Sequence, residues 1–368
     1  MNENKQKNRI GLIFPEWKEL ILRLTAEYAK VSELDHGMVK RIITSYAEKL
    51  PDIKNKIRHA PPVVVMSTLA KSEGSYHGSL SLAEILEKIK HATLSPNEFF
   101  VIYDVIEQRY TWVDPSIEKV LGIKQEKFTV ESVIGISPNG NLCVQEDSPH
   151  KIRWAGIAYL ILSLPGLCFK SMEEQYAVSI RINTNFSSRS DLAKAGTAVL
   201  TKRCHFIFND DSRVMGFPRY HVDKISVHDK SLFTYVRPSF ESNFIQSEYI
   251  NSLSYLINCA IIDIDTKYVL MLEEKARQER NKAIAVAMNH HMKEFGNITK
   301  EIPESHVADC FAKTVKSKVE ESYNLWQLPS NRVNVESDSD AVEHAKRLGL
   351  LTIPQKVKEL MYRSIDIK

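Results

Sequence analysis

Two short apolar stretches followed by a capped helix restrict the fold of this chain more than any other feature. The stretches FFVIYDV (99–105) and RYTWV (109–113) are rich in β-branched and aromatic residues and flank a short polar break, so they predict two paired strands. The Asp114 carboxylate can accept hydrogen bonds from the free N–H groups that begin a helix, and Pro115 suits the first helical position. Gly122 permits the left-handed turn that ends a helix. The segment therefore predicts a strand pair that leads directly into a short helix.

Further strands are expected after this helix. Three stretches with strand composition occupy residues 176–184, 198–208 and 217–227, and LFTYVRPSF (232–240) could extend the sheet. Before them, KFTVESVIG predicts a second short helix, and residues 150–164 predict a longer one. The expected fold class is α+β, with these strands and helices forming one domain over residues 95–240.

The region before this sheet, residues 1–94, is predicted to be helical. A later helix in it should begin at Ser81, because Ser81 and Glu84 have the spacing of a capping box. An earlier helix is indicated by apolar side chains that recur at helical spacing on one face, namely Trp17, Leu20, Ile21, Leu24 and Tyr28.

The region after the sheet, residues 241–368, is predicted to be helical as well. No glycine or proline occurs between Pro238 and Gly296, and this absence favours long helices. The apolar residues from Ile250 to Met271 approximate a heptad repeat. A lone helix would leave this stripe exposed, so we expect it to pack against the sheet or a second subunit, and a homodimer is the favoured assembly.

Composition and charge are those of an ordinary globular protein. The 368 residues are 43% hydrophobic and 26% charged, and the net charge of +3 is too small to predict strong nucleic-acid affinity by itself. The longest apolar run, residues 155–169, is too short to cross a bilayer, and the N-terminus lacks the features of a secretory signal. We therefore expect a cytoplasmic protein that has no membrane partner.

The cysteines argue against a disulfide framework or a zinc site. Their number is odd, they are widely spread, and none belongs to a CxxC pair. The five cysteines are Cys143, Cys168, Cys204, Cys259 and Cys310. Free buried thiols in a reducing compartment are the expected state, and no metal site is predicted.

The order strand, strand, helix, short helix, helix and three antiparallel strands is that of a PAS domain, and residues 95–230 resemble this family. The family's first strand is matched by FFVIYDV, and its second strand and first helix by RYTWVDPSIEKVLGI, which resembles an aromatic-Val-Asn/Ser-Pro phrase. YAVSIRIN resembles the strand that carries an Arg or Lys on the outer sheet surface, where Arg181 stands, and HVDKIS resembles the closing strand. The chain departs from the family in two places, with VQEDSPH for His-Pro-Asp-Asp and SSRSDLAKAG for an Asp-Gly turn.

This resemblance implies that residues 95–230 form a five-stranded antiparallel sheet with helices packed on one face, and that a pocket lies between the sheet and these helices. The candidate pocket residues are Tyr103, Trp112, Trp154 and Tyr159, although aromatic side chains in such places more often form plain core. No cysteine lies in the Asn-Cys-Arg-Phe phrase that flavin photochemistry needs, and the one histidine near the long helix, His150, better suits a cap than a haem ligand. We therefore expect no cofactor and a colourless protein.

The sequence gives no sign of an enzyme. It lacks a Walker lysine loop, a GxSxG elbow and paired metal-ligand motifs. His290 and His291 are similar to the phosphate-accepting pair of some histidine kinases, but no glycine-rich ATP-binding region follows them. A surface histidine pair is the simpler interpretation, and a phosphorelay component is the weakest functional alternative.

The best candidates for contacts with DNA lie in the C-terminal region. Lys313, Lys316 and Lys318 follow an apolar helical stripe and could face phosphates, although no clear turn glycine marks a helix-turn-helix. PAS domains with a helical N-terminal segment resemble those of bacterial regulators that carry a C-terminal helix-turn-helix. We therefore expect a signal-responsive transcriptional regulator that binds DNA and senses a small-molecule or protein ligand through the PAS-like domain. The alternative is a non-enzymatic scaffold that uses the PAS-like domain for docking or dimerisation.

Overall fold

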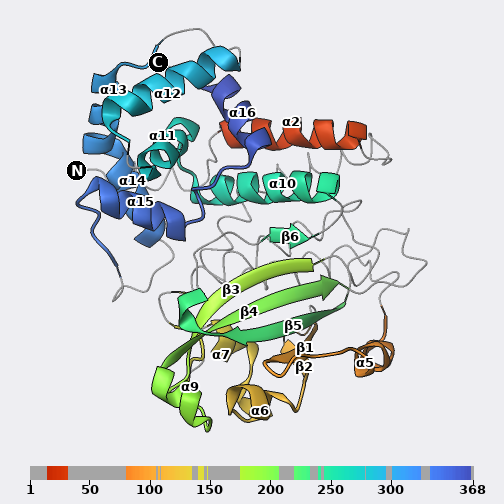
Figure 1. Ribbon diagram of the computed structural model, residues 1–368. Coiled ribbons are helices and arrows are strands. Elements are labelled where there is room, and N and C mark those ends of the chain that lie inside the picture. The colour runs from red at the N-terminus through yellow and green to blue at the C-terminus, as the bar shows by residue number, and fades with distance from the viewer. Residues whose placement is uncertain are drawn as a thin grey trace, which may run out of the picture. The chain divides into compact units, whose positions relative to one another are not determined.

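A computed structural model describes thirteen segments of the chain (Figure 1). These segments are residues 15–31, 80–104, 107, 109–134, 140–144, 147, 175–206, 219–232, 239–241, 244–277, 279–295, 301–324 and 332–365. They belong to two compact units, Met1–Arg58 with Glu248–Lys368, and His59–Ser247. The three consecutive regions predicted from the sequence are therefore grouped differently, because the first helix joins the C-terminal helices.

One antiparallel sheet organises the unit His59–Ser247. Its strands are β1 (Glu98–Asp104), β2 (Arg109–Val113), β3 (Gln175–Asn183), β4 (Thr197–Phe206), β5 (Tyr220–His228) and β6 (Ser239–Glu241), in the order β2-β1-β5-β4-β3-β6. The α+β class and the five antiparallel strands are confirmed. The sixth strand is short and pairs with β3 at the end of the stretch that was expected to extend the sheet.

The strand pair leads into a short helix as predicted, but Pro115 lies before the helix, which begins two residues later than expected and has Ser116 at its N-cap. Helix α6 (Ile117–Leu121) follows β2, and the Asp114 carboxylate accepts a hydrogen bond from the Ser116 backbone N–H at 2.8 Å. Gly122 ends the helix with φ of 67°. A Cβ atom at Gly122 would lie 2.8 Å from the Ser188 backbone nitrogen, so both the conformation and the space require glycine.

Each face of the sheet carries its own apolar cluster. On one face, here called the inner face, Phe99, Val101 and Leu200 pack with α6 and with α7 (Val130–Ile134). On the other, the outer face, Phe100 and Ile102 pack with α5 (Leu82–Lys90). The predicted capping box of α5 is present, because the Ser81 and Glu84 side chains each accept from the other residue's backbone N–H. The remaining short helices of this unit are α9 (Ser190–Ala195), η1 (Gln125–Lys127) and η3 (Lys230–Leu232).

The other unit is helical, as predicted. Its helices are α2 (Pro15–Val31), α10 (Phe244–Ile262), α11 (Thr266–Ala276), α12 (Asn281–Glu294), α13 (Glu304–Cys310), the π-helical turn η4 (Phe311–Val315), α14 (Lys316–Asn324), α15 (Asp338–Arg347) and α16 (Gln355–Ser364). The buried face of α2 contains Trp17, Leu20, Ile21 and Leu24. The Trp17 indole donates a hydrogen bond to the Ile264 carbonyl at 3.1 Å, so the first helix is tied to the C-terminal helices. Within the described segments, no helix is both long and apolar enough to cross a membrane.

The expected heptad stripe is divided between two helices. Asp263 has a positive φ of 64°, which ends α10, and the Asp265 carboxylate caps α11 by accepting from the Lys267 N–H at 2.9 Å. Stripe residues on both sides of this break, such as Ile257 and Met271, are buried within the chain. Because the stripe residues whose burial is described are already covered, they give no further reason to expect a homodimer.

Candidate functional site on the inner sheet face

The central strands β4 and β5 place four reactive side chains on the inner face. Side chains alternate along a strand, so Lys202 and Cys204 lie on the same face as Leu200. By the same alternation, His221 and Asp223 lie on the inner face together with the β5 core residues Ile225 and Val227. Lys202, Cys204, His221 and Asp223 are here called the inner-face cluster.

The side chains of the inner-face cluster converge because of the strand register. Cys204 and Asp223 are direct cross-strand partners, and His221 lies diagonally across from Cys204. Cys204 Sγ lies 2.7 Å from Asp223 Oδ1 and 3.4 Å from His221 Nδ1, and His221 Nδ1 lies 3.0 Å from Asp223 Oδ1. Lys202 Nζ takes the other carboxylate oxygen, Oδ2, at 2.6 Å. All four residues are buried.

The lysine and the aspartate of this cluster form a buried ion pair. Burial alone would lower the pKa of Lys202, but the Asp223 carboxylate outweighs burial and holds that pKa well above its usual value. Burial alone would raise the pKa of Asp223, but Lys202 and then His221 hold it well below its usual value. Lys202 is therefore protonated and Asp223 ionised throughout the neutral range.

Aromatic rings line this cluster. Tyr103 is the β1 partner of His221, and the two ring centroids lie 4.8 Å apart. The Lys202 ammonium lies 6.0 Å from the centroid of the Tyr103 ring, and Tyr110 packs edge-on against Tyr103 at 6.0 Å. Burial raises the pKa of both tyrosine hydroxyls, so both stay neutral.

The two predicted pocket residues that the structure describes do not lie together. Tyr103 lies at the inner-face cluster. Trp112 packs instead with the α5 cluster on the outer face, on the same side as its cross-strand partner Ile102. Trp154 and Tyr159 lie outside the described residues.

Sequence reasoning missed the four residues of the inner-face cluster. One local signal was available, since the strand HVDKIS places His221 and Asp223 two residues apart and therefore on one face. Cys204 and Lys202 repeat that spacing on the preceding strand. Nothing local shows that the two pairs meet, because only the β4–β5 register brings them together.

The geometry does not support a Cys–His–Asp proton relay. In such a relay the nucleophile and the aspartate use different nitrogens of the imidazole. Here Cys204 Sγ and Asp223 Oδ1 both approach His221 Nδ1. Three donor atoms directed at one another in this way suit binding better than acid–base catalysis.

The lysines predicted to contact DNA lie on η4 and α14, and each has an acidic partner. Lys313 Nζ lies 3.1 Å from Asp309, and Lys318 Nζ lies 2.8 Å from Glu321. Lys316 lies 3.8 Å from Asp338. A phosphate would therefore have to compete with carboxylates at all three positions.

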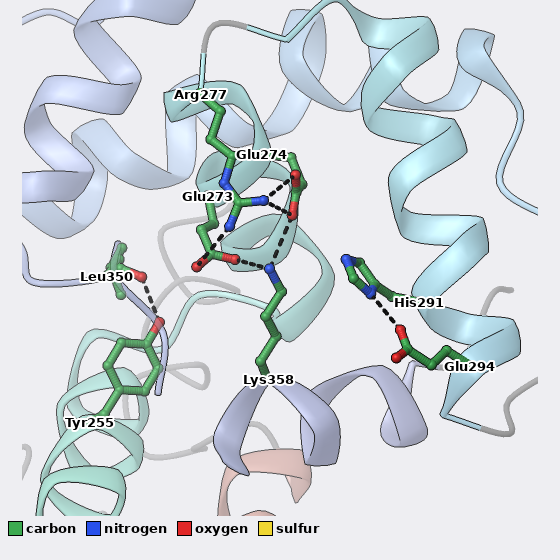
Figure 2. A network of polar contacts seen from close by, with 8 residues as sticks. All are labelled: Tyr255, Glu273, Glu274, Arg277, His291, Glu294, Leu350 and Lys358. Atoms are coloured by element: carbon green, nitrogen blue, oxygen red, sulfur yellow. Dashed lines mark hydrogen bonds and ion pairs between the residues drawn. The ribbon is translucent and has the colours of Figure 1, made fainter. Parts of the chain in front are cut away.

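A second buried lysine lies in the helical unit (Figure 2). Lys358 of α16 reaches Glu273 at 2.8 Å and Glu274 at 3.2 Å, both on α11. Arg277 contacts Glu274 at 3.1 Å from the opposite side. These four residues, here called the Lys358 cluster, contain two cations and two carboxylates. His291 of α12 lies near them, but its Nδ1 atom lies 3.1 Å from the Glu294 carboxylate, so its partner is Glu294 and not a member of the Lys358 cluster.

Comparison of the chain with protein-family models, with curated proteins and with solved structures finds no match.

Proposed function

We propose that the protein is a signal-responsive regulator whose sheet domain binds a small polar ligand at the inner-face cluster. The observation that carries this proposal is the Lys202–Asp223 ion pair, which lies on the face that also holds the domain's apolar core. Replacing a buried ion pair by apolar side chains is often neutral or stabilising. Stability alone therefore does not explain the pair, whereas recognition of a polar ligand does.

The order of the elements supports a PAS-like sensor. Strands β1 and β2 are followed by α6 and α7, and then by the antiparallel strands β3, β4 and β5. Tyr103 lies at the inner-face cluster, where a sensor of this kind would hold its ligand. Such modules also serve docking and dimerisation, so the ligand is the point that must be tested.

The test for a ligand is native mass spectrometry of the full chain purified gently from cells. We expect a bound mass on the wild-type protein that is lost in the double variant Lys202→Met/Asp223→Leu, which removes both charges together. The matched control is Lys358→Met, which removes a buried lysine from the other unit. A wild-type protein with no bound species, and with no thermal shift against a metabolite panel, would refute ligand sensing.

We further propose that the regulator acts on transcription, with the helical unit as the DNA-contacting part. Lys313, Lys316 and Lys318 would supply phosphate contacts after exchanging their carboxylate partners. Replacing all three by alanine should weaken binding to every DNA sequence and reduce the salt dependence by up to about three phosphate contacts. Binding measured against salt concentration tests this, and an unchanged slope would remove these lysines from the interface.

A non-enzymatic scaffold is the second candidate function. The observation that favours it is the pairing of all three lysines with carboxylates, which lowers their attraction for phosphate. A pull-down of genomic fragments at low salt separates the two candidates. No enriched fragment, together with a reproducible protein partner, would favour the scaffold, and enriched fragments would favour the regulator. Light scattering at micromolar concentration tests the homodimer, which stays a prediction.

A further inference from the structure

We propose that Cys204, His221 and Asp223 bind one zinc-class divalent metal ion. This inference rests on the proposed function in one respect, because it assigns a ligand class to the same inner-face cluster. Three different donor atoms, Sγ, Nδ1 and Oδ1, lie within 4.8 Å of one another, and all three residues are buried. Thiolate, imidazole and carboxylate are the three ligand types that zinc accepts in proteins.

The spacing of the donor atoms is close to that of a ligand triangle. Bonds of about 2.0 to 2.3 Å in a tetrahedral site place ligand atoms about 3.3 to 3.7 Å apart. The Cys204–His221 separation of 3.4 Å already has this length, and the His221–Asp223 separation of 3.0 Å is slightly short. Only the Cys204–Asp223 separation of 2.7 Å has to open appreciably, and rotation of the Cys204 side chain about its Cα–Cβ bond can provide this.

The carboxylate of Asp223 is arranged to serve both a metal ion and Lys202. Lys202 takes Oδ2, whereas Oδ1 faces Cys204 and His221. A second partner of this kind orients a ligating carboxylate and holds it ionised. The position of Lys202 therefore stabilises the site without occupying a ligand position.

Binding the metal ion requires a defined exchange of protons. The Cys204 thiol loses its proton to solvent as the sulfur–metal bond forms, and His221 keeps its proton on Nε2 so that the Nδ1 lone pair can bind. A divalent ion with one thiolate and one carboxylate is neutral, and Lys202 then leaves one positive charge in the cluster. A hydroxide or another small anion in the fourth position would balance that charge.

The contacts also explain why a metal ion fits better than a catalytic triad. Both Sγ and Oδ1 approach the same imidazole nitrogen, so that nitrogen cannot pass a proton between them. A metal ion instead requires all three atoms to face a common point. The site is assembled from two strands, which is why no CxxC pair or other short metal motif marks it in the sequence.

The test uses the full, untagged chain and measures the metal directly. Mass spectrometry of the metal content should find about one zinc ion per wild-type chain purified without chelator. After the zinc is removed, Co²⁺ should give visible absorption and a near-ultraviolet thiolate-to-cobalt band. Both signals should be lost in Cys204→Ala and in His221→Gln, and both should persist in the matched control Cys259→Ala, which removes a buried thiol from the other unit.

The metal site can be tested even if one of these variants does not fold. If Cys204→Ala does not fold, Cys204→Ser replaces sulfur by oxygen, and a folded Cys204→Ser protein that keeps the thiolate band would overturn the site. A folded wild-type chain that gives no cobalt spectrum would overturn it as well. A wild-type chain without metal that still holds an organic ligand would leave the proposed function intact. A protein that holds one metal ion per chain but binds neither DNA nor a protein partner would instead refute the proposed regulatory function and leave the metal site intact.

Discussion

Each unit of the molecule buries a lysine against carboxylates, but the two lysines have different neighbours. Lys358 reaches both Glu273 and Glu274, and Arg277 supplies a second cation, so two cations balance two carboxylates in the Lys358 cluster. Among the described residues, Lys202 has one ion-pair partner, Asp223, and that carboxylate also contacts Cys204 and His221. The first arrangement is saturated by ion pairs, whereas the second presents three metal-ligating atoms to one another.

The two clusters differ in how far their charged groups are shielded from solvent. Arg277 is 55% exposed, so the Lys358 cluster keeps contact with solvent through one member. Asp223 is fully buried, and its neighbours Cys204 and His221 are buried as well. A fully buried charge lowers the stability of the fold unless it is compensated, and here the charge lies beside side chains that can bind a ligand. For this reason we place the binding site at the inner-face cluster.

The largest effect is expected from breaking the Lys202–Asp223 pair. Lys202→Met leaves a carboxylate without its cation in a fully buried place, which should lower the free energy of unfolding by about 3–5 kcal/mol. Lys202→Met/Asp223→Leu should recover most of this loss, because no charge then remains buried. Urea denaturation followed by circular dichroism measures both values. A loss below about 1 kcal/mol in the single variant would contradict the ion pair.

A smaller effect is expected from Lys358→Met. Arg277 remains beside Glu274 in this variant, so the two carboxylates keep one cation. We expect a loss of about 2–3 kcal/mol in the free energy of unfolding. The same denaturation experiment compares the two clusters, and a loss greater than that of Lys202→Met would reverse their ranking.

The pH dependence of stability sharpens the comparison further. In the wild type, the lowered pKa of Asp223 gives stability that is lost only as pH falls below about 4, and the raised pKa of Lys202 gives stability that is lost only above about 10.5. The pair therefore contributes a constant amount between pH 5 and pH 9, roughly the neutral range.

In Asp223→Asn, the free energy of unfolding should no longer be constant over this pH range but should rise with pH. Lys202 then keeps its burial without its carboxylate, so its folded-state pKa falls below the unfolded value. The unfolded chain binds more protons, and the variant should gain up to about 1.4 kcal/mol of stability per pH unit as pH rises. Denaturation midpoints between pH 6 and pH 9 measure the slope, and the wild type is the control. Parallel profiles for the two proteins would show that Lys202 does not depend on Asp223.

The smallest effect is expected from an exposed ion pair. Lys318 and Glu321 face solvent, where such a pair contributes little. Lys318→Ala should change the free energy of unfolding by no more than about 0.5 kcal/mol. It therefore serves as the baseline in the denaturation series, and a loss above about 1 kcal/mol would mean that the helix surface has contacts beyond this pair.

The sequence by itself determined the local elements of this protein. The capping box at Ser81 and Glu84 and the left-handed Gly122 formed as predicted, because each depends on hydrogen bonds and backbone angles within a few residues. Asp114 instead accepts from Ser116 N–H in the turn before the helix, whose N-cap is Ser116. The composition and alternation of the residues were also sufficient to locate the strands, but not their order in the sheet. The end of α10 at Asp263 was not predicted, because a positive φ outside glycine has no reliable local signal.

Only the tertiary structure decided which residues meet. Trp17 and Ile264 are joined by a hydrogen bond although 247 positions separate them, so the first helix belongs with the last ones. The inner-face cluster depends on the register of β4 against β5, and a shift of one residue would turn Cys204 to the outer face. Local propensities fix the period of a strand but not its partner, and it is the burial of apolar area over the whole sheet that selects the register.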